Sequence, residues 1–215
     1  IRVSLVGSEM CIRDSLSARF NRCPDRRDKM PLIECTLIKG YDSEVRQRLA
    51  ERVTDAACAS IGAAADFVTV TIKEVDPENY MRGRTMRVPA AAPRPAEDIV
   101  KDFLTKMEAR DLDAARSHLS ESFSMTFPGP ARFTELEELI AWARARYRSA
   151  SKTYEGFDTA YHGTRSTVFC YGTLSGTWLD GTAFSGVRFI DRFELEGETI
   201  TSQMVWNDLA EAKPT

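Results

Sequence analysis

A short stretch rich in proline and alanine divides this chain into two parts. Residues 88–95 read Val-Pro-Ala-Ala-Ala-Pro-Arg-Pro and show no hydrophobic period. Because proline lacks the backbone N–H that helices and central strands need, this stretch predicts a semi-rigid spacer. The sequence therefore predicts one domain at residues 30–87, a linker at 88–95, a second domain at 96–210 and a tail at 211–215.

The first domain has the pattern of a strand, a helix and a second strand. Residues 32–38 are rich in apolar and β-branched side chains, and residues 67–75 alternate apolar with polar, so both stretches predict strands. Between them, residues 45–57 are apolar at helical spacing, after a Gly-Tyr-Asp-Ser turn at 40–43 that can cap the helix and before a stop at Gly62. This order predicts a right-handed βαβ unit with parallel strands. So small a unit buries little core, and we expect it to pack against another copy or the second domain, so that the chain forms a homo-oligomer.

The second domain begins with helical patterns and continues with strands. Three helices are predicted from the apolar spacing of Ile99–Met107, of Leu112–Leu119 and of Leu136–Tyr147, the last opened by a capping box at 134–137. From Lys152 onward the chain predicts strands separated by glycine-containing turns. The expected fold class is therefore α+β: a small βαβ domain followed by an α+β cone with helices on one face of a curved antiparallel sheet.

Composition excludes several classes of protein. With 43% hydrophobic and 28% charged residues and a net charge of −3, the chain has the composition of a soluble protein. No apolar run approaches the ~20 residues of a membrane span. The slightly acidic balance argues against nucleic-acid binding. Five cysteines show no metal or disulfide spacing, so we expect no metal, no cofactor and a reducing compartment, by default the cytoplasm.

Residues 1–29 are predicted to lie outside the fold. Residues 5–15 resemble the in-frame translation of a sequencing-library adaptor, and residues 16–29 are rich in arginine and aspartate without an apolar period. We therefore expect Met30 to be the natural start and Pro31 to be the mature first residue once the methionine is trimmed.

Residues 31–84 resemble the 4-oxalocrotonate tautomerase superfamily. The resemblance rests on Pro31 after Met30, a first strand leading to Gly40, the helix, a second strand ending in Lys73-Glu74-Val75, and Glu78-Asn79-Tyr80. It implies an amino-terminal proline that acts as a base and moves a proton beside a carbonyl. It also implies hexamers or trimers of paired βαβ units.

The chemistry of such a base follows from general principles. A free prolyl amine titrates above neutrality, and an apolar pocket near cations lowers its pKa towards the working pH. A base poised there contributes roughly a hundredfold or more to proton transfer. Removing a proton beside a carbonyl also needs positive charge near the developing oxygen or the substrate carboxylate. An amide nitrogen at Pro31 cannot be such a base.

The chain departs from the superfamily at the arginines. Tyr41 and Thr69 occupy the positions of the two family arginines, and Tyr80 occupies that of the aromatic wall. Arg82 and Arg84 follow, and at spacing two on an extended segment they would point the same way and grip a carboxylate. The alternative is a solvated basic patch with Arg87. The predicted site is therefore catalytic Pro31 with Arg82, Arg84, Tyr80 and Tyr41 binding the substrate.

Residues 95–210 resemble the SnoaL-like branch of the nuclear-transport-factor-like cone fold, through the stretches 96–104, 108–115 and 189–195. Cone folds host isomerases, cyclases, hydrolases and binding modules, so the resemblance implies a fold and little about function. Asp191 is the one polar member of the alternating stripe from Val187 to Leu195, which makes it a candidate general acid or base. The alternatives are pairing with an arginine such as Arg192 or Arg165, or exposure at a strand edge.

Together these observations predict an isomerase that acts on a small carbonyl acid through the Pro31 base. Two alternatives stay open: a non-catalytic ligand-binding or assembly module that uses the cone pocket, and isomerase or cyclase chemistry through Asp191. The expected partners are a small-molecule substrate and further copies of the chain, with no nucleic acid and no membrane.

Overall fold

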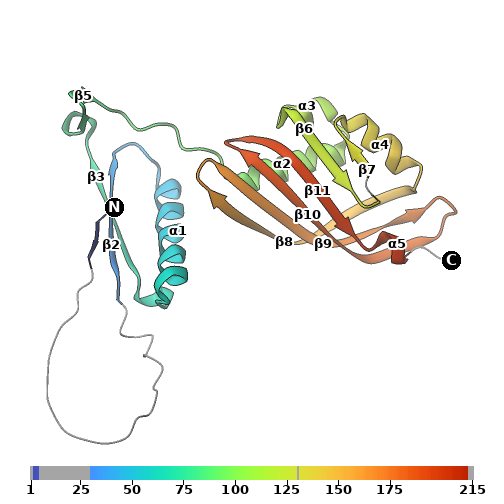
Figure 1. Ribbon diagram of the computed structural model, residues 1–215, viewed down its shortest axis with the longest axis horizontal. Helices are drawn as coiled ribbons and strands as arrows, with labels where there is room; N and C mark the ends of the chain where they lie inside the picture. Colours follow the sequence, from blue (N-terminus) through green and yellow to red (C-terminus); the bar gives the residue numbers. More distant parts are fainter. Residues whose placement is uncertain (1, 5–29, 130, 213–215) are drawn as a thin grey trace, which may run out of the picture. The chain divides into compact units, whose positions relative to one another are not determined.

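The computed structural model describes residues 2–4, 30–129 and 131–212 (Figure 1). The chain divides into two compact units, residues 1–92 and 93–215, and this division falls within the predicted linker. The adaptor-like stretch and residues 213–215 of the predicted tail lie outside the described residues. Each unit is a separate fold.

The first unit is built on a parallel pair of strands. Strand β2 (Leu32–Ile38) pairs with β3 (Thr69–Val75), in register from Leu32 opposite Thr69 to Ile38 opposite Val75, and α1 (Ser43–Ile61) connects them. This is the predicted βαβ unit. Strand β1 (Arg2–Ser4) pairs antiparallel with the other edge of β2, so residues 2–4 of the predicted leader belong to the sheet.

Helix α1 begins and ends where the sequence signals stand. The Asp42 carboxylate accepts a hydrogen bond of 2.8 Å from the Val45 N–H, and Gly62 ends the helix with a φ of 67°. No residue of α1 is fully buried. The described part of this unit buries only Pro31, Ile33, Cys35 and Ala63. The unit therefore has apolar surface left to pack elsewhere.

A tight hairpin follows β3. After the 3-10 turns η2 (Ala65–Phe67) and η3 (Pro77–Asn79), strands β4 (Met81–Arg82) and β5 (Thr85–Met86) pair through the turn residues Gly83 and Arg84. Both turn residues have positive φ, 55° and 64°, which is typical of a two-residue hairpin turn. The expectation of an extended segment was wrong here, because the chain reverses between Arg82 and Thr85.

The second unit is a curved six-stranded sheet with helices on one face, as Figure 1 shows. The strand order is β7-β6-β11-β10-β9-β8. All neighbouring strands are antiparallel except β6 and β11, which run parallel, so the sheet is mixed. The elements are α2 (Ala96–Ala109), α3 (Leu112–Arg116), β6 (Leu119–Phe127), β7 (Ala131–Phe133), α4 (Leu136–Arg144), β8 (Tyr147–His162), β9 (Arg165–Trp178), β10 (Ala183–Glu196), β11 (Thr199–Asn207) and α5 (Leu209–Ala212).

The core of this unit lies between α2 and the sheet. Phe103 of α2 packs edge-on against Phe123 of β6 and Phe193 of β10, with ring centroids 6.5 and 6.0 Å apart. All three rings are buried. Each such side chain contributes about 1.5–3 kcal/mol by leaving water. The predicted apolar stripe of α2 is the stripe that faces the sheet.

The region between α3 and α4 differs from the prediction. Two strands, β6 and β7, separate these helices, and Leu119 opens β6 although its spacing continues the α3 pattern. The predicted capping box is not formed, because α4 begins after Glu135, which makes no capping hydrogen bond through its side chain. Tyr147 likewise opens β8.

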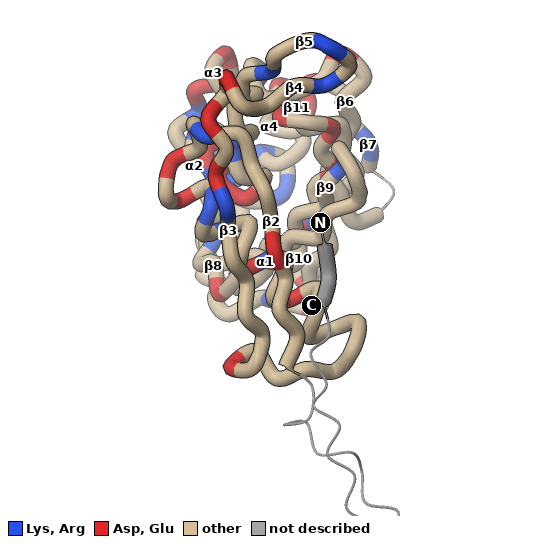
Figure 2. Tube along the Cα trace, turned by 90° about the vertical axis from the view of Figure 1, so that its left-hand side faces the viewer, with Lys and Arg blue, Asp and Glu red and all other residues tan. Residues whose placement is uncertain are grey.

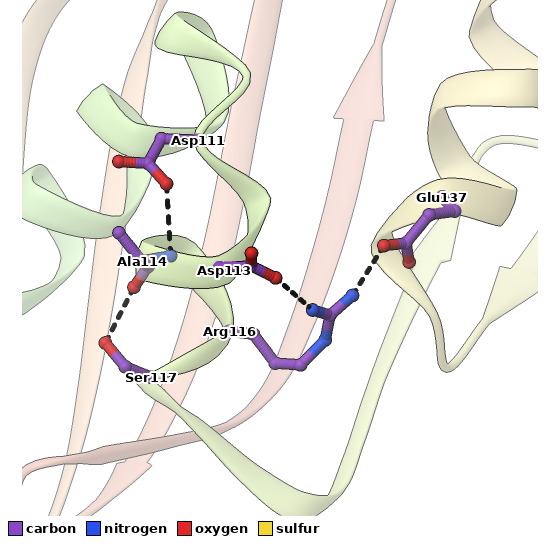
Figure 3. Close-up of polar contacts among 6 residues, drawn as sticks. All are labelled: Asp111, Asp113, Ala114, Arg116, Ser117 and Glu137. Carbon is purple, nitrogen blue, oxygen red and sulfur yellow. Dashed lines mark hydrogen bonds and ion pairs between the residues drawn. The ribbon is translucent and has the colours of Figure 1, made fainter.

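Polar contacts join α3 to α4 (Figure 3). Asp111 caps α3 by accepting a hydrogen bond of 3.2 Å from the Ala114 N–H. Arg116 contacts Asp113 at 3.1 Å and reaches Glu137, in the first turn of α4, at 2.6 Å. The hydrogen bond from Arg116 lowers the pKa of the Glu137 carboxyl.

Among the described helices, none combines the length and the apolar character needed to cross a membrane.

The close approach of β8 and β9 depends on Gly172. The pairing of these strands shifts register between Tyr154 and Gly156, and a Cβ atom at Gly172 would lie 2.0 Å from the Thr153 carbonyl oxygen. We therefore expect Gly172→Ala to lower the free energy of unfolding by at least about 2 kcal/mol, because backbone must move to relieve the overlap. Urea unfolding followed by circular dichroism measures this, with Ser175→Ala on the same strand as control. Equal unfolding midpoints for Gly172→Ala and the wild type would contradict the close backbone approach at Gly172.

Candidate functional site

Pro31 stands at the amino-terminal end of the parallel pair. It directly precedes β2, it is buried, and its carbonyl oxygen accepts a hydrogen bond of 3.0 Å from the Thr69 N–H. Pro31 and Thr69 therefore lie side by side. The alanine-rich segment that leads into β3 contributes buried Ala63 to this unit.

The other predicted site residues stand at the opposite end. Tyr41 follows β2, while Tyr80, Arg82 and Arg84 follow β3. Because β2 and β3 run parallel, all four lie beyond the carboxyl ends of the strands. A strand of seven residues spans about 23 Å at ~3.3 Å per residue. One copy of the chain therefore does not bring Pro31 together with these four residues.

Two tyrosines are fixed at the carboxyl end by backbone contacts. The Tyr41 carbonyl accepts a hydrogen bond of 2.7 Å from Arg46, which also pairs with Glu74 at 3.0 Å. The Tyr80 carbonyl accepts one of 3.3 Å from the Arg87 N–H. Both side chains are half-buried. The backbone of both residues is thereby held at the carboxyl end of the strand pair.

The hairpin adds exposed positive charge at this end (Figure 2). Arg82, Arg84 and Arg87, here called the basic hairpin, are all exposed. No ion pair joins any of them to a carboxylate in the described part of the chain. Their guanidinium groups are therefore open to an anionic ligand. Both hypotheses from the sequence, that these arginines bind the substrate carboxylate or that they form a solvated basic patch, are consistent with this exposure.

The second unit holds a cavity of about 200 Å³ between its helices and its sheet. Side chains of α2, α4, β6, β8, β9 and β11 line it. The wall is largely apolar, with Lys152, Tyr154 and Gln203 among its polar members. No group of three His, Cys, Asp or Glu side chains that could hold a metal gathers within the described ranges.

Asp191 lies beneath this cavity as part of a buried ion pair. Its side chain is fully buried; one oxygen, Oδ2, contacts the Lys152 ammonium and accepts a hydrogen bond of 3.1 Å from Gln203 Nε2. The other, Oδ1, has no hydrogen-bond partner among the described residues. The expected alternatives, pairing with Arg192 or Arg165 and exposure at a strand edge, were wrong. Arg192 instead pairs with Glu194, because neighbouring residues of a strand point to opposite faces.

Burial sets the protonation of the groups around this pair. Burial, with further contributions from the Cys170 and Asp191 charges, raises the pKa of the Tyr154 hydroxyl. Burial beside Asp191 also raises the pKa of the Cys170 thiol to about 12. Both groups therefore stay protonated at neutral pH, and Tyr154 can serve as a hydrogen-bond donor.

Lys152 is the functional candidate that the sequence prediction missed. It lies on β8, where the half-buried Lys152 and Tyr154 alternate with exposed neighbours. A lone lysine at the inward phase of a strand is the signal that could have identified it. Asp191 itself does not line the cavity, whereas Lys152 and Gln203 do.

Comparison with known proteins gives two kinds of likeness. One kind is to solved structures. An NTF2-like protein of unknown function from Burkholderia pseudomallei K96243 shares 18% identity, over 54% of this chain and 92% of that chain, with a TM-score of 0.45. An NTF2-like protein from Burkholderia thailandensis E264 shares 18% identity, over 56% of this chain and 99% of that chain (TM-score 0.47), and a putative polyketide cyclase from Pseudomonas putida KT2440 shares 16% identity, over 56% and 99% (TM-score 0.44).

No curated protein sequence matches the chain. The other kind of likeness is to a family model described as "Tautomerase enzyme", which matches residues 31–87. This match covers the βαβ unit from Pro31 through the basic hairpin. The likeness to this tautomerase family is therefore confined to residues 31–87.

Proposed function

We propose that this chain is an isomerase that moves a proton beside the carbonyl of a small carbonyl acid, with the amine of Pro31 as the base. The proposal concerns the form in which Pro31 is the first residue. The observation that carries it is the tautomerase-family match that starts at Pro31. The buried position of Pro31 at the head of β2 supports it, because burial disfavours the charged amine.

In this proposal the basic hairpin supplies the charge that the reaction needs. The Pro31 amine takes a proton from the carbon beside the carbonyl and returns it elsewhere on the conjugated acid. Arg82 and Arg84 bind the carboxylate or the developing enolate oxygen through charge-assisted hydrogen bonds. Tyr41 and Tyr80 form walls of the same pocket.

The proposed site requires more than one copy of the chain. Pro31 and the basic hairpin lie at opposite ends of the β2–β3 pair, so a second copy packed in the reverse direction would bring one copy's proline to its partner's arginines. The hairpin also exposes Met81, Met86 and Val88, which are 59%, 60% and 77% accessible. Such apolar exposure favours packing against another protein surface.

The first test is Pro31→Ala in protein whose first residue is position 31. We expect the ketonisation of phenylpyruvate, followed by ultraviolet absorbance, to slow by at least about a hundredfold because the positioned secondary amine is lost. The full 215-residue chain, whose Pro31 nitrogen is an amide, is the matched control and is expected to be as slow. Unchanged turnover in Pro31→Ala would remove the proline from the mechanism.

The second test asks whether one site draws on two copies. We expect Arg82→Ala/Arg84→Ala to raise KM at least about tenfold, through the loss of charge-assisted hydrogen bonds. Unfolding and refolding this variant together with Pro31→Ala should give more turnover at substrate concentrations below the raised KM than either variant gives alone, since mixed assemblies contain some intact sites. Each variant refolded by itself is the control. An assembled mixture that stays inactive would contradict a shared site.

A second candidate function is small-ligand binding in the cavity of the second unit. The specific observation is an apolar cavity whose wall holds Lys152 and Gln203 over the buried Asp191 carboxylate. Isomerase or cyclase chemistry through Asp191 belongs to the same candidate. It would need Lys152 or Gln203 to move aside, since both contact the carboxylate from the cavity wall.

Asp191→Asn separates these roles. We expect it to lower the free energy of unfolding by about 2 kcal/mol, because the part-buried Lys152 ammonium loses its counter-charge. Glu194→Gln, which breaks the more exposed pair with Arg192 on the same strand, should cost less than about 1 kcal/mol. Phenylpyruvate turnover below the unfolding temperature should be the same in both variants. Turnover lost only in Asp191→Asn would place chemistry in the cone.

A further inference from the structure

Among the described residues that line the cavity of the second unit, Lys152 is the sheltered cation. The charged side chains that line it are Glu108, Arg110 and Lys152. Glu108 and Arg110 come from the end of α2 and are exposed, whereas the Lys152 side chain is only 25% exposed. Most of the remaining wall is aromatic or aliphatic, including Phe103, Leu104, Met107, Phe127, Leu139 and Leu174. A ligand in this cavity would therefore meet mostly apolar surface and, away from the exposed Glu108 and Arg110, the Lys152 ammonium.

Asp191 does not use all of the hydrogen-bonding capacity of Lys152. A lysine ammonium carries three N–H donors, and among the described contacts Asp191 accepts from it through Oδ2 alone. The same nitrogen lies 4.6 Å from the centroid of the Phe189 ring, a favourable cation–π contact. Gln203 donates to the same Oδ2. The carboxylate and the ring thus hold the ammonium in place, the amide holds the carboxylate, and the ammonium keeps donors for a ligand.

We propose that this cavity binds a small molecule that carries a carboxylate or enolate oxygen on an apolar body, with Lys152 Nζ as its direct partner. Asp191 and Gln203 are positioning residues that hold the ammonium at the wall. The inference deepens the second candidate function, since it names the ligand class of that cavity.

The surrounding hydroxyl groups fit an acidic oxygen. Tyr147 and Tyr154 line the same cavity, and burial raises the pKa of both, so they stay protonated and can donate. A charged oxygen that accepts from an ammonium and a phenol forms charge-assisted hydrogen bonds. The cavity volume of about 200 Å³ is below the roughly 300–1,000 Å³ of drug-sized sites, which favours a small ligand.

The test compares trans-cinnamate with cinnamamide, two probes of nearly equal shape that differ in charge. Isothermal titration at pH 7.5 with the full chain should show cinnamate binding at least about tenfold more tightly. Lys152→Met alone would leave the Asp191 charge buried without a partner and could unfold the unit. The decisive variant is therefore Lys152→Met/Asp191→Asn, which removes both charges. Lys101→Met, at an exposed lysine that also pairs with a carboxylate, is the matched control.

The expected result is that the double variant binds the two probes equally, while Lys101→Met keeps the preference for cinnamate. A preference that survives in the double variant would overturn the role of Lys152. Equal binding of both probes by the wild type would overturn the acid class and leave ligand binding by the cavity standing. Failure of both probes to bind at millimolar concentration would count against the ligand class and the binding function together. None of these outcomes bears on Pro31, which lies in the other unit.

Discussion

The second unit depends on how it accommodates one buried charge. An isolated carboxylate inside a protein is strongly unfavourable, so the fold is stable only if Asp191 keeps its partners. Those partners come from two other strands, Lys152 from β8 and Gln203 from β11. The pairing of β8, β9, β10 and β11 must therefore hold its register for the charge to be compensated. The same requirement fixes an ammonium group at the cavity wall.

The first unit is under the opposite constraint, because it has little interior. Its helix has no fully buried residue, and its described buried side chains cluster on β2 and the segment before β3. A small sheet with one covering helix leaves apolar surface in contact with water. The second unit, by contrast, buries Phe103, Phe123 and Phe193 in one continuous core. The two units thus differ in how much of their apolar side-chain surface each buries in its own core.

Much of the fold could be predicted because its signals are local. The period of residues 32–38, the Asp42 cap and the Gly62 stop are each read within a few residues, and the structure places them as expected. The strands β6 and β7 were missed because Leu119 continues the spacing of the preceding helix. The Arg82–Arg84 geometry failed because a non-glycine residue at positive φ is uncommon, and Arg84 has a φ of 64°.

The candidate sites were harder to predict, because strand pairing decides them. The partner of Asp191 could not be chosen among the basic residues of the chain without the register that brings Lys152 of β8 near β10. Likewise, the motif around Pro31 identifies a possible base but does not identify the residues that lie opposite it in the site. Only the parallel direction of β2 and β3 shows that the arginines of the same copy stand at the far end.

That strand direction has a consequence for how the protein behaves in dilute solution. If each proposed pocket is completed by a neighbouring copy, the number of working pockets follows the association equilibrium and not the total amount of chain. Specific turnover would then fall on dilution below the dissociation constant of the assembly and recover on concentration, with no change in any individual fold. The parallel direction of β2 and β3 would thereby make the rate of the proposed reaction depend on the protein concentration.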